Sequence, residues 1–356
     1  MVLLNVNQLI SNNIYMGNTK KRTVNRISNR SQINTKSKKK KKIYKSQKNL
    51  KGKVKKIIVK KKMSDEAIAK REGDYFDSKS YDIILRSDAD VFYIKDGKEI
   101  PLIKFRKAVF PNNLCQIGLD NLREAAKKFH DNRGAAAGKV MISKLPSYAN
   151  DPSKWKSKST FRVTGYYSKE TGKFVNNSIG NLSQSNIIGY FDRADRNLGK
   201  DAPKCRTTAF TSQQVSKWKA VLPFIKCIDA QFKKLLPDRH KVQLNRARKT
   251  KKWQILDTAF STLTINYNWR TALHKDKGDL HEGFGNLIVL EEGNYKGGET
   301  GFPQFGIAVD VRHGDFLAMD VHEWHCNTKI IGKDYTRLSL VAYLRESMIQ
   351  CAKMNI

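Results

Sequence analysis

The stretch AFSTLTINYNWRTALHKDKGD, residues 259–279, decides the fold expected for this chain. Its first half alternates and is rich in β-branched and aromatic residues, which is typical of a strand over residues 259–269. His274 and Asp276 follow this strand, and residues two positions apart on an extended backbone point to the same side. We therefore predict that both side chains reach one metal ion from a strand end, with Lys275 turned away.

A third ligand is expected from MDVHEWHCNT, residues 319–328, which contains His322 and His325. His325 lies 51 residues after His274 and 12 residues before Arg337. Its shorter distance to Arg337, which is expected on the next strand, favours His325. His322 stays open as the alternative ligand.

Two imidazoles and one carboxylate can occupy one face of Fe(II), which leaves open positions for a bidentate 2-oxo acid and for O2. His274, Asp276 and His325 are the residue types that this site requires. A single His-x-Asp pair occurs often by chance, so the prediction depends on the order of features around it. These features are a strand, His-x-Asp, a glycine-rich hairpin, a Gly-Asp-Phe turn, a histidine and an Arg-x-Ser strand.

The segment YTRLSLVAYL, residues 335–344, is expected to bind 2-oxoglutarate. Arg337 and Ser339 share one face of a strand, and a guanidinium fork beside a hydroxyl suits the distal carboxylate of this co-substrate. Arg337 is thus grouped with the three iron ligands as catalytic. We place Asn266 at the same co-substrate site. Arg345 is the alternative arginine.

The expected fold class is α+β, with a double-stranded β-helix (jelly-roll, cupin-like) core and flanking helices. The core is predicted over residues 253–350, because strand patterns and turn-rich hairpins follow one another there. Residues 63–252 are expected to form the N-terminal part of the catalytic module. This part should contain a hairpin over residues 91–105 with an Asp96-Gly97 turn, a helix over 118–132 and a hairpin over 160–175 that turns near Gly172. A further helix should begin at Thr211, with Thr211 and Gln214 as its capping box, and Pro223 should kink or split it.

Residues 1–62 contain 20 Lys or Arg and no Asp or Glu, whereas the other 294 residues contain 48 basic and 33 acidic residues. The first segment therefore holds +20 of the net charge of +35. Such a like-charged segment is expected to be disordered. It suits a nucleic-acid arm or a nuclear-localisation segment, with a merely solvated tail and an organelle transit peptide beginning MVLLNVNQLISNNIY as alternatives.

Two classes of structure are disfavoured by composition. No run of about 18 apolar residues exists, so we expect no membrane span. The five cysteines are scattered and lack Cys-x-x-Cys spacing, which argues for a reducing compartment and against structural zinc.

The segment NRGAAAGK, residues 132–139, is a candidate for contact with substrate or nucleic acid. Its glycines, Gly134 and Gly138, permit close backbone approach, and Arg133 or Lys139 could hold a phosphate or stack on a base. It is not a phosphate-binding P-loop, because no Ser or Thr follows the Gly-Lys pair. A tight connection between elements is the alternative. Further candidates for the pocket lining are Trp269, Arg270 and Trp324, although bulky aromatics are more often core residues.

Several stretches together resemble the TET and J-binding protein (TET/JBP) group of 2-oxoglutarate and Fe(II) oxygenases, particularly its JBP-like branch. They are NRGAAAGK (132–139), CRTTAF (205–210), TINYNWRTALHKDKGD (264–279), the Gly297-Gly298 hairpin, GDFLAMDVHEWHCNT (314–328) and residues 337–346. The resemblance covers roughly residues 110–350. The resemblance includes neither the cysteine-rich zinc region of animal TET proteins nor the separate DNA-recognition domain of some J-binding proteins. It therefore does not indicate how the protein would be directed to its sites on DNA.

This resemblance implies oxidation of the 5-methyl group of thymine or 5-methylcytosine in nucleic acid. It also implies Fe(II) on His274, Asp276 and His325, 2-oxoglutarate on Arg337, O2 as oxidant, and residues 133–138 near the base or backbone. DNA is favoured over RNA, a monomer is expected, and the expected location is intracellular, in the nucleus or at the site of DNA replication. A prolyl or lysyl protein hydroxylase and a non-catalytic DNA-binding protein are the competing functions.

Overall fold

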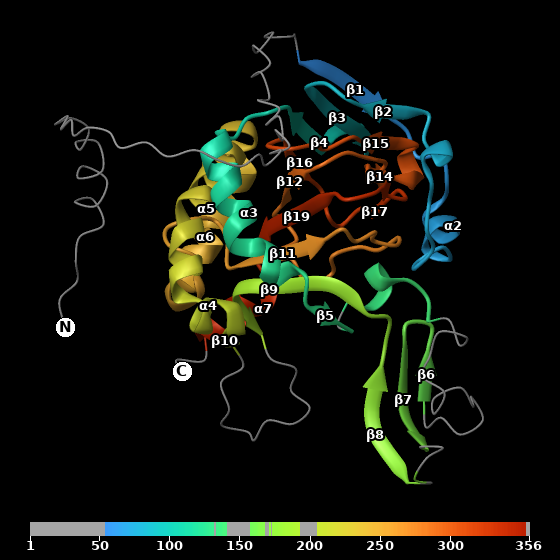
Figure 1. Ribbon diagram of the computed structural model, residues 1–356. Coiled ribbons are helices and arrows are strands. Elements are labelled where there is room, and N and C mark those ends of the chain that lie inside the picture. The colour runs from blue at the N-terminus through green and yellow to red at the C-terminus, as the bar shows by residue number, and fades with distance from the viewer. Residues whose placement is uncertain are drawn as a thin grey trace, which may run out of the picture. The chain divides into compact units, whose positions relative to one another are not determined.

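The computed structural model describes residues 54–131, 133–140, 157–167, 171, 173–192 and 205–353. Most of its strands belong to one large sheet (Figure 1), formed by β1 (Lys55–Val59), β3 (Ala89–Lys95), β4 (Lys98–Arg106), β5 (Phe129–His130), β9 (Ser183–Asp192), β10 (Cys205–Thr207), β11 (Thr262–Tyr267), β12 (Gly285–Glu292), β16 (Phe316–Met319) and β19 (Thr336–Tyr343). The strand order is β1-β3-β4-β16-β12-β19-β11-β9-β10, with β5 paired to β9. Neighbours are antiparallel except β1 and β3, which pair in parallel.

A smaller sheet faces part of the large one. It contains β2 (Ile83–Leu85), β14 (Thr300–Phe302), β15 (Ile307–Val309) and β17 (Cys326–Asn327), in the order β17-β14-β15-β2. A two-stranded ribbon joins β13 (Tyr295–Lys296) and β18 (Ile331–Gly332). Side chains from both sheets share one buried cluster, including Leu287 and Val289 from the large sheet and Phe302 and Ile307 from the small one. The chain therefore has the double-stranded β-helix core that its sequence predicted.

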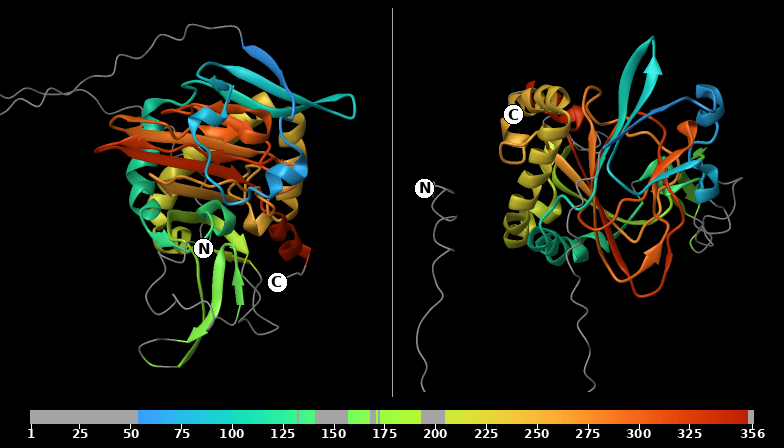
Figure 2. Two further views of the ribbon diagram at one scale, coloured as in Figure 1. Left: turned by 90° about the vertical axis from the view of Figure 1, so that its right-hand side faces the viewer. Right: turned by 90° about the horizontal axis from the view of Figure 1, so that it is seen from above.

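The opposite face of the large sheet is covered by helices. The helices on that face include α3 (Asn112–Ala126), α5 (Val215–Leu235) and α6 (Pro237–Lys249), with α4 (Ala209–Gln213) and α7 (Glu346–Lys353) nearby. In contrast, α2 (Asp65–Ala69) lies beside the smaller sheet, where Ile68 packs with Ala308 and Cys326. The 3-10 turns are η1 (Ser78–Ser80), η2 (Gly134–Ala137), η7 (Lys251–Trp253) and η8 (Pro303–Phe305). Figure 2 shows α5 and α6 on one side of the large sheet and the smaller sheet on the other. The apolar faces of α3 and α5 pack against Leu338, Leu340 and Ala342 of β19.

Strand alternation divides β19 between these two environments. Leu338, Leu340 and Ala342 belong to the cluster beneath the helices, whereas Ser339 and Val341 line a cavity on the other face. Because successive side chains of a strand point to opposite faces, one strand can both anchor the helices and build a polar site. The mostly buried sequence of β19 reflects this double coverage.

The N-terminal hairpin agrees with the prediction. β3 and β4 pair antiparallel, and Asp96 and Gly97 at their turn have positive φ values of 50° and 73°. A second antiparallel pair joins β7 (Arg162–Tyr167) to β8 (Phe174–Ile179), with β6 (Ser157–Ser159) alongside β7. This pair confirms the hairpin expected over residues 160–175. Its expected turn at Gly172 lies outside the described residues.

The helix predictions need correction. The helix expected over residues 118–132 is α3, which begins at Asn112 and has ended before β5. Thr211 is not a cap, because it lies inside α4, where its hydroxyl accepts a hydrogen bond from the backbone of Gly189. Pro223 does not split α5, which continues through it. The helical break comes earlier, at Gln214.

The predicted boundary of the basic tail at residue 62 is also wrong. Lys55–Val59 forms β1, and its backbone pairs with Ala89–Tyr93 of β3. Edge pairing fixes this segment despite its charge, because the alternating side chains Ile57 and Val59 pack toward the core. Residues 1–53, and with them the predicted arm and the transit-like beginning, lie outside the described part of the chain.

Two cysteines that the sequence left unpaired form a disulfide. Cys205 in β10 and Cys351 in α7 are joined, with their Cα atoms 6.0 Å apart. The spacing of 146 residues gave no sign of this pair, because folding alone brings β10 and α7 together. The cysteine pattern is therefore no evidence for a reducing compartment. Separately, no helix within the described ranges is long and apolar enough to cross a bilayer.

Candidate metal centre and cavity

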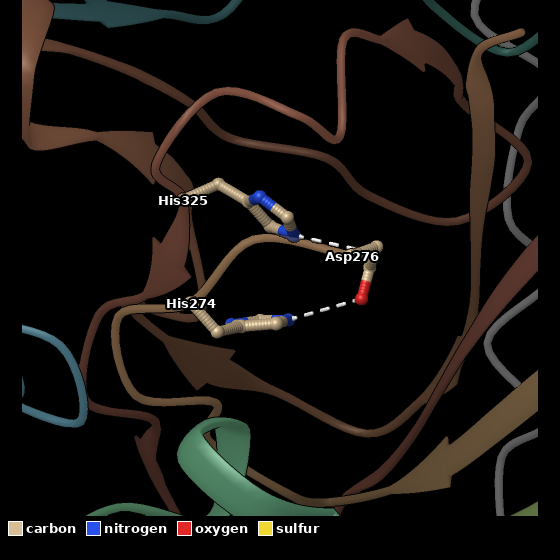
Figure 3. Close-up of side chains that lie close together, drawn as sticks. All are labelled: His274, Asp276 and His325. Atoms are coloured by element: carbon tan, nitrogen blue, oxygen red, sulfur yellow. Dashed lines mark ion pairs between the residues drawn. The ribbon is translucent and has the colours of Figure 1, made fainter. Parts of the chain in front are cut away.

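Three side chains converge as a candidate metal centre (Figure 3). One potential ligand atom from each of His274, Asp276 and His325 lies within 4.8 Å of the other two. Nε2 of His274 is 3.7 Å from one carboxylate oxygen of Asp276, and Nε2 of His325 is 3.6 Å from the other. The two Nε2 atoms and the carboxylate thus point toward one common position.

The backbone fixes which imidazole nitrogen is free. Nδ1 of His274 donates to the carbonyl of Ala272 at 2.7 Å, and Nδ1 of His325 donates to the carbonyl of Glu323 at 2.9 Å. With the proton on Nδ1, Nε2 presents its lone pair to the common position. Hydrogen bonds of this kind orient metal-ligating histidines and select their tautomer.

The charge states also suit a cation. Burial lowers the pKa of His274 to about 4, so its imidazole is neutral near pH 7. Burial alone would raise the pKa of Asp276, but its interactions with the side chains of His325 and His274 lower the pKa below the usual range, so the carboxylate is ionised near pH 7. Two imidazole nitrogens and one carboxylate are the donor set of a facial Fe(II) site, so the residues fit that ion.

The ligands are held by a backbone bridge rather than by a strand end, contrary to the sequence prediction. β11 ends at Tyr267, and His274 lies in the loop beyond it. His274 and His325 form an isolated antiparallel bridge. The amide of Asp276 donates to the carbonyl of Val321 at 3.0 Å, which ties the loop to the segment that carries His325. The ammonium of Lys275 lies 5.1 Å from the ring centre of Trp324, and Lys275 also contributes to the cavity wall described below.

The alternative ligand His322 lies outside the cluster. Its Nε2 is 3.3 Å from the carbonyl oxygen of Asp279, and its ring meets that of His281 edge to face. The structure therefore places His325, which the sequence favours over His322, in the cluster with His274 and Asp276. His322 supports the loop that follows Asp276.

A cavity of about 350 Å³ opens beside the metal centre. Its walls come from β11, β12, β19, the ligand loop and η2. Besides the ligands, the lining combines polar groups with apolar ones, among them Arg133, Asn266, Ser339, Tyr343, Ile187 and Val341. Such a mixture of an apolar wall and a few convergent polar groups is typical of small-ligand sites.

Arg337 is buried at 1% exposure and is short of partners. One terminal nitrogen donates to the carbonyl of Gly298 at 3.0 Å, while Nε has no hydrogen-bond partner. Arg337 has no ion pair among the described residues, although a buried guanidinium is costly unless an anion compensates it. It shares the strand face of Ser339 but lies outside the residues that line the cavity. The unpaired Nε fits a co-substrate carboxylate.

Two further polar side chains meet beside this position. Nδ2 of Asn266 donates to Oγ of Ser339 at 3.3 Å, and both residues line the cavity. The carbonyl oxygen of the Asn266 side chain is buried without a partner. Both residues therefore line the cavity, and the Asn266 side-chain oxygen is free of hydrogen bonds within the described part of the chain.

The segment 132–139 is divided in its roles. Arg133 lines the cavity and donates through Nε to Ser185 Oγ at 2.7 Å. Gly134 and Gly138 do not line it; a Cβ at Gly138 would meet the ring of Tyr75, so this glycine permits packing. Lys139 pairs with Asp74 at 2.6 Å and also lies away from the cavity.

The aromatic and arginine residues predicted for the pocket lining also differ in where they lie. Trp269 lines the cavity. Arg270 does not, because its guanidinium donates to the carbonyls of Phe76 and Asn327 and to the carboxylate of Asp77. Trp324 is 6% exposed and belongs to a core cluster.

The sequence reasoning missed several polar cavity residues, including Tyr343, Thr264 and Asp279. Tyr343 and Thr264 meet there, with their hydroxyl oxygens 3.2 Å apart. Asp279 lies nearby, and burial raises its pKa. The alternation of side chains along a strand could have identified the first two, because Tyr343 shares a strand face with Ser339, and Thr264 shares one with Asn266. Asp279 gave no such signal, because it follows an irregular loop.

Arg345, the alternative arginine, also lines the cavity. It already has an anionic partner, because its guanidinium forms an ion pair with Asp192. It also stacks on Phe191, with Cζ 4.3 Å from the ring centre. Within the described residues Arg337 thus has no ion pair but does not line the cavity, whereas Arg345 lines the cavity and is already paired.

Comparison with known proteins agrees with this geometry. Residues 186–346 match the family model Tet_JBP, described as the oxygenase domain of the 2OGFeDO superfamily. The chain is 32% identical over 224 residues to a thymine dioxygenase JBP1 of Trypanosoma brucei brucei, covering 62% of this chain and 25% of the relative. It is 28% identical over 269 residues to the JBP1 of Crithidia fasciculata, covering 73% and 32%.

The chain thus spans about a quarter to a third of the length of these relatives. A solved structure, NgTET1 in complex with 5mC DNA, aligns with a TM-score of 0.45 at 13% identity, covering 74% of this chain and 79% of the other. The family match includes all three members of the metal cluster and Arg337. Residues 186–346 are therefore similar to the oxygenase domain of the Tet_JBP family, within the 2OGFeDO superfamily.

Proposed function

We propose that this chain is an Fe(II)- and 2-oxoglutarate-dependent dioxygenase that hydroxylates the 5-methyl group of thymine or 5-methylcytosine in DNA. The observation that carries the proposal is the convergence of His274, Asp276 and His325 beside a cavity. The names of the relatives support the substrate class, since they are thymine dioxygenases.

The chemistry divides between cofactor and protein. Fe(II) with 2-oxoglutarate and O2 supplies oxidation of an unactivated C–H bond, coupled to decarboxylation of the co-substrate to succinate. His274, Asp276 and His325 would hold the ion. Arg337, with Ser339 and Asn266 beside it, would bind the co-substrate carboxylate through charge-assisted hydrogen bonds.

The rest of the cavity would position the base. Ile187, Val341 and Met319 supply apolar wall that excludes water, and Arg133 and Trp269 supply polar and flat surfaces for a pyrimidine ring. In a duplex, the target base would have to leave the stack to enter such a cavity. Holding the methyl group beside the metal would lower the activation barrier, because the loss of translational and rotational freedom is then met on binding.

DNA is the proposed polymer, and the basic segment 1–62 supports nucleic acid as partner because lysines release counterions from phosphates. A monomer acting in the nucleus or at the site of DNA replication is part of the same proposal. A protein hydroxylase would use the same iron and co-substrate residues, so these residues alone do not favour a protein substrate.

The decisive experiment is nucleoside mass spectrometry after incubation of the full chain with Fe(II), 2-oxoglutarate and air. The substrates are DNA with thymine only, DNA with 5-methylcytosine, and RNA with and without 5-methylcytosine, and succinate is measured in each reaction. We expect 5-hydroxymethyl nucleosides from one of the DNA polymers.

Each other outcome contradicts a named part of the proposal. Oxidised base from RNA alone would exclude DNA as the polymer. Succinate without oxidised base would point to a protein hydroxylase, and no succinate would point to a binding protein without catalysis. A His274→Ala variant is the control for iron-dependent turnover.

A further inference from the structure

The helices α5 and α6 carry a concentration of positive charge that the proposed reaction does not use. Residues 215–253 contain 12 Lys or Arg and two Asp or Glu, a net charge of +10. Outside residues 1–62 the chain has a net charge of 48 − 33 = +15. Two thirds of that charge therefore lies in 39 residues.

The charged side chains lie on the outer face of the helices. Lys219, Lys226 and Lys233 recur every seven residues along α5, and Lys241 and Arg248 do so along α6, and all five are exposed. Seven residues span about 10 Å of helix, close to the Debye length of about 8 Å at physiological salt. Neighbouring charges on one helix are therefore only partly screened from one another.

The protein itself does little to neutralise this surface. Lys226 pairs with Asp257, whereas Lys219, Lys233, Lys241 and Arg248 have no ion pair within the ranges that the structure describes. Basic residues in a last helical turn are favoured by the helix dipole, which accounts for Lys233 and Arg248. It does not account for Lys219 or Lys241.

A general lysine bias does not explain the pattern. α3 packs beside α5 in the same helical layer, yet over Asn112–Ala126 it has one basic and two acidic residues. Its acidic side chains are engaged in local contacts, such as Gln116 to Asp120 at 2.8 Å. Within the helical layer, the positive charge is thus concentrated on α5, α6 and the segment that follows them, rather than on α3.

This surface is separated from the cavity by the large sheet. The buried side of α5 packs on the sheet face that carries Leu338 and Leu340, whereas Ser339 and Val341 on the opposite face line the cavity. Figures 1 and 2 show α5 and α6 along the outside of that sheet. A base in the cavity and a polymer on these helices would belong to different stretches of nucleic acid.

We propose that the outer face of α5 and α6 binds the phosphate backbone of a second stretch of DNA, independently of the cavity. The contacts would be sequence-independent, because lysine and arginine at regular intervals match a polyanion without reading bases. The proposal does not rest on the base oxidation.

The surface suits a nucleic acid better than a membrane or a protein. Membrane-surface helices combine basic residues with a large exposed apolar face, but the large hydrophobic residues exposed on α5 and α6 are Val215 and Val242. Specific protein interfaces need buried aromatic or apolar anchors, and Trp218 and Phe224 already pack into the core.

The test compares two full-length variants that each lose four positive charges. One replaces the helix residues (Lys219→Gln, Lys233→Gln, Lys241→Gln, Arg248→Gln), and the other replaces exposed lysines elsewhere (Lys70→Gln, Lys79→Gln, Lys95→Gln, Lys98→Gln). Affinity for a short DNA duplex is measured over a range of NaCl concentrations. Thermal unfolding and Fe(II) binding show that both variants are folded.

We expect the helix variant to lose up to about 3.6 from the magnitude of the slope of log K against log salt, at about 0.9 per lost phosphate contact. The matched control should lose less than about 1. A variant with Lys219→Arg, Lys233→Arg and Lys241→Arg should retain the original slope. These results together would support binding of DNA phosphates by the outer face of α5 and α6.

Equal losses in the helix variant and the control would overturn the proposal, since they would show a general effect of net charge. An unchanged slope in the helix variant would overturn it as well. Unchanged DNA binding with reduced binding to phosphatidylserine vesicles would identify a membrane surface instead. Turnover of 2-oxoglutarate reports on the proposed function separately.

Discussion

His274 and His325 exchange both backbone hydrogen bonds of a single antiparallel bridge, with N to O distances of 3.0 Å in each direction. Two residues 51 positions apart therefore face one another, with ring centres 4.3 Å apart. The bridge sets the separation of the two imidazoles before any metal arrives. The preformed geometry lowers the cost of organising the site.

The bridge predicts that the two nearby histidines of residues 319–328 behave differently. His325→Ala should weaken Fe(II) binding by at least about 100-fold, because it removes one of three ligands and even the loss of a group that only supports a ligand costs 10–100-fold. His322→Ala is the matched control and should change it by less than about 10-fold. Calorimetry under anaerobic conditions measures both. Equal losses would contradict the ligand assignment.

Arg337→Met should raise the KM for 2-oxoglutarate about 10- to 100-fold, because a charge-assisted hydrogen bond contributes about 1.5–3 kcal/mol. Its thermal stability should not fall, since the buried guanidinium has no anionic partner among the residues that the structure describes. Arg345→Met should show the reverse pattern, a lower melting temperature and a smaller change in KM, because it breaks the pair with Asp192. A larger KM effect at Arg345 would reverse the assignment of the two arginines.

Gly297→Ala should destabilise the fold by about 2–4 kcal/mol. Gly297 has φ of +77°, and a Cβ there would overlap the carbonyl oxygen of Lys329. Gly97→Ala is the matched control, since φ is +73° but no atom lies within 4 Å of the new Cβ. It should cost only about 1 kcal/mol. Urea unfolding measures both, and equal costs would show that the overlap is relieved.

Asp90 should contribute to the loss of stability in acid. Burial works to raise its pKa, but hydrogen bonds from Arg106 and Lys104, each 2.8 Å long, lower the pKa below the ordinary value. Its stabilising contribution is therefore complete above the unfolded-state pKa of about 3.9 and is lost as pH falls through the lower folded-state pKa. Urea midpoints of Asp90→Asn should vary less with pH in that acidic range than those of the parent. An identical pH profile would contradict this role.

Reduction of the Cys205–Cys351 disulfide should destabilise the protein by about 2–4 kcal/mol, because the bond closes a long loop in the unfolded chain. Alkylation of the denatured, unreduced protein should label the three free cysteines, and reduction should raise this to all five. Cys351→Ser should abolish the difference in melting temperature with and without reductant. Five labels before reduction would show that the disulfide does not form.

Residue type and spacing predicted much of the metal centre. His274, Asp276 and His325 were identified because few side chains can bind Fe(II) while leaving positions open, and Arg337 because its strand partner is Ser339. The β3–β4 hairpin was equally accessible, since Asp96 and Gly97 encode its turn locally. These features depend on chemistry or on short-range backbone preference.

Other features were wrong or missed because they depend on distant contacts. β1 was expected to be disordered from its charge, yet it finds a parallel partner in β3. Arg270 was expected in the pocket, but carbonyls of Phe76 and Asn327 hold its guanidinium elsewhere. No local pattern encodes such partners, which lie 34 residues away for Lys55 and Ala89 and 194 residues away for Arg270 and Phe76.

The sequence by itself determined which side chains could bind iron and a carboxylate, because ligand chemistry belongs to the individual residue. Only the tertiary structure decided that His274 meets His325 through a loop bridge, and that Tyr343, Thr264 and Asp279 share their cavity. It also decided that Arg337 is buried without an anion while Arg345 is paired. The physical reason is that burial, pairing and register arise from packing between segments that are remote in sequence.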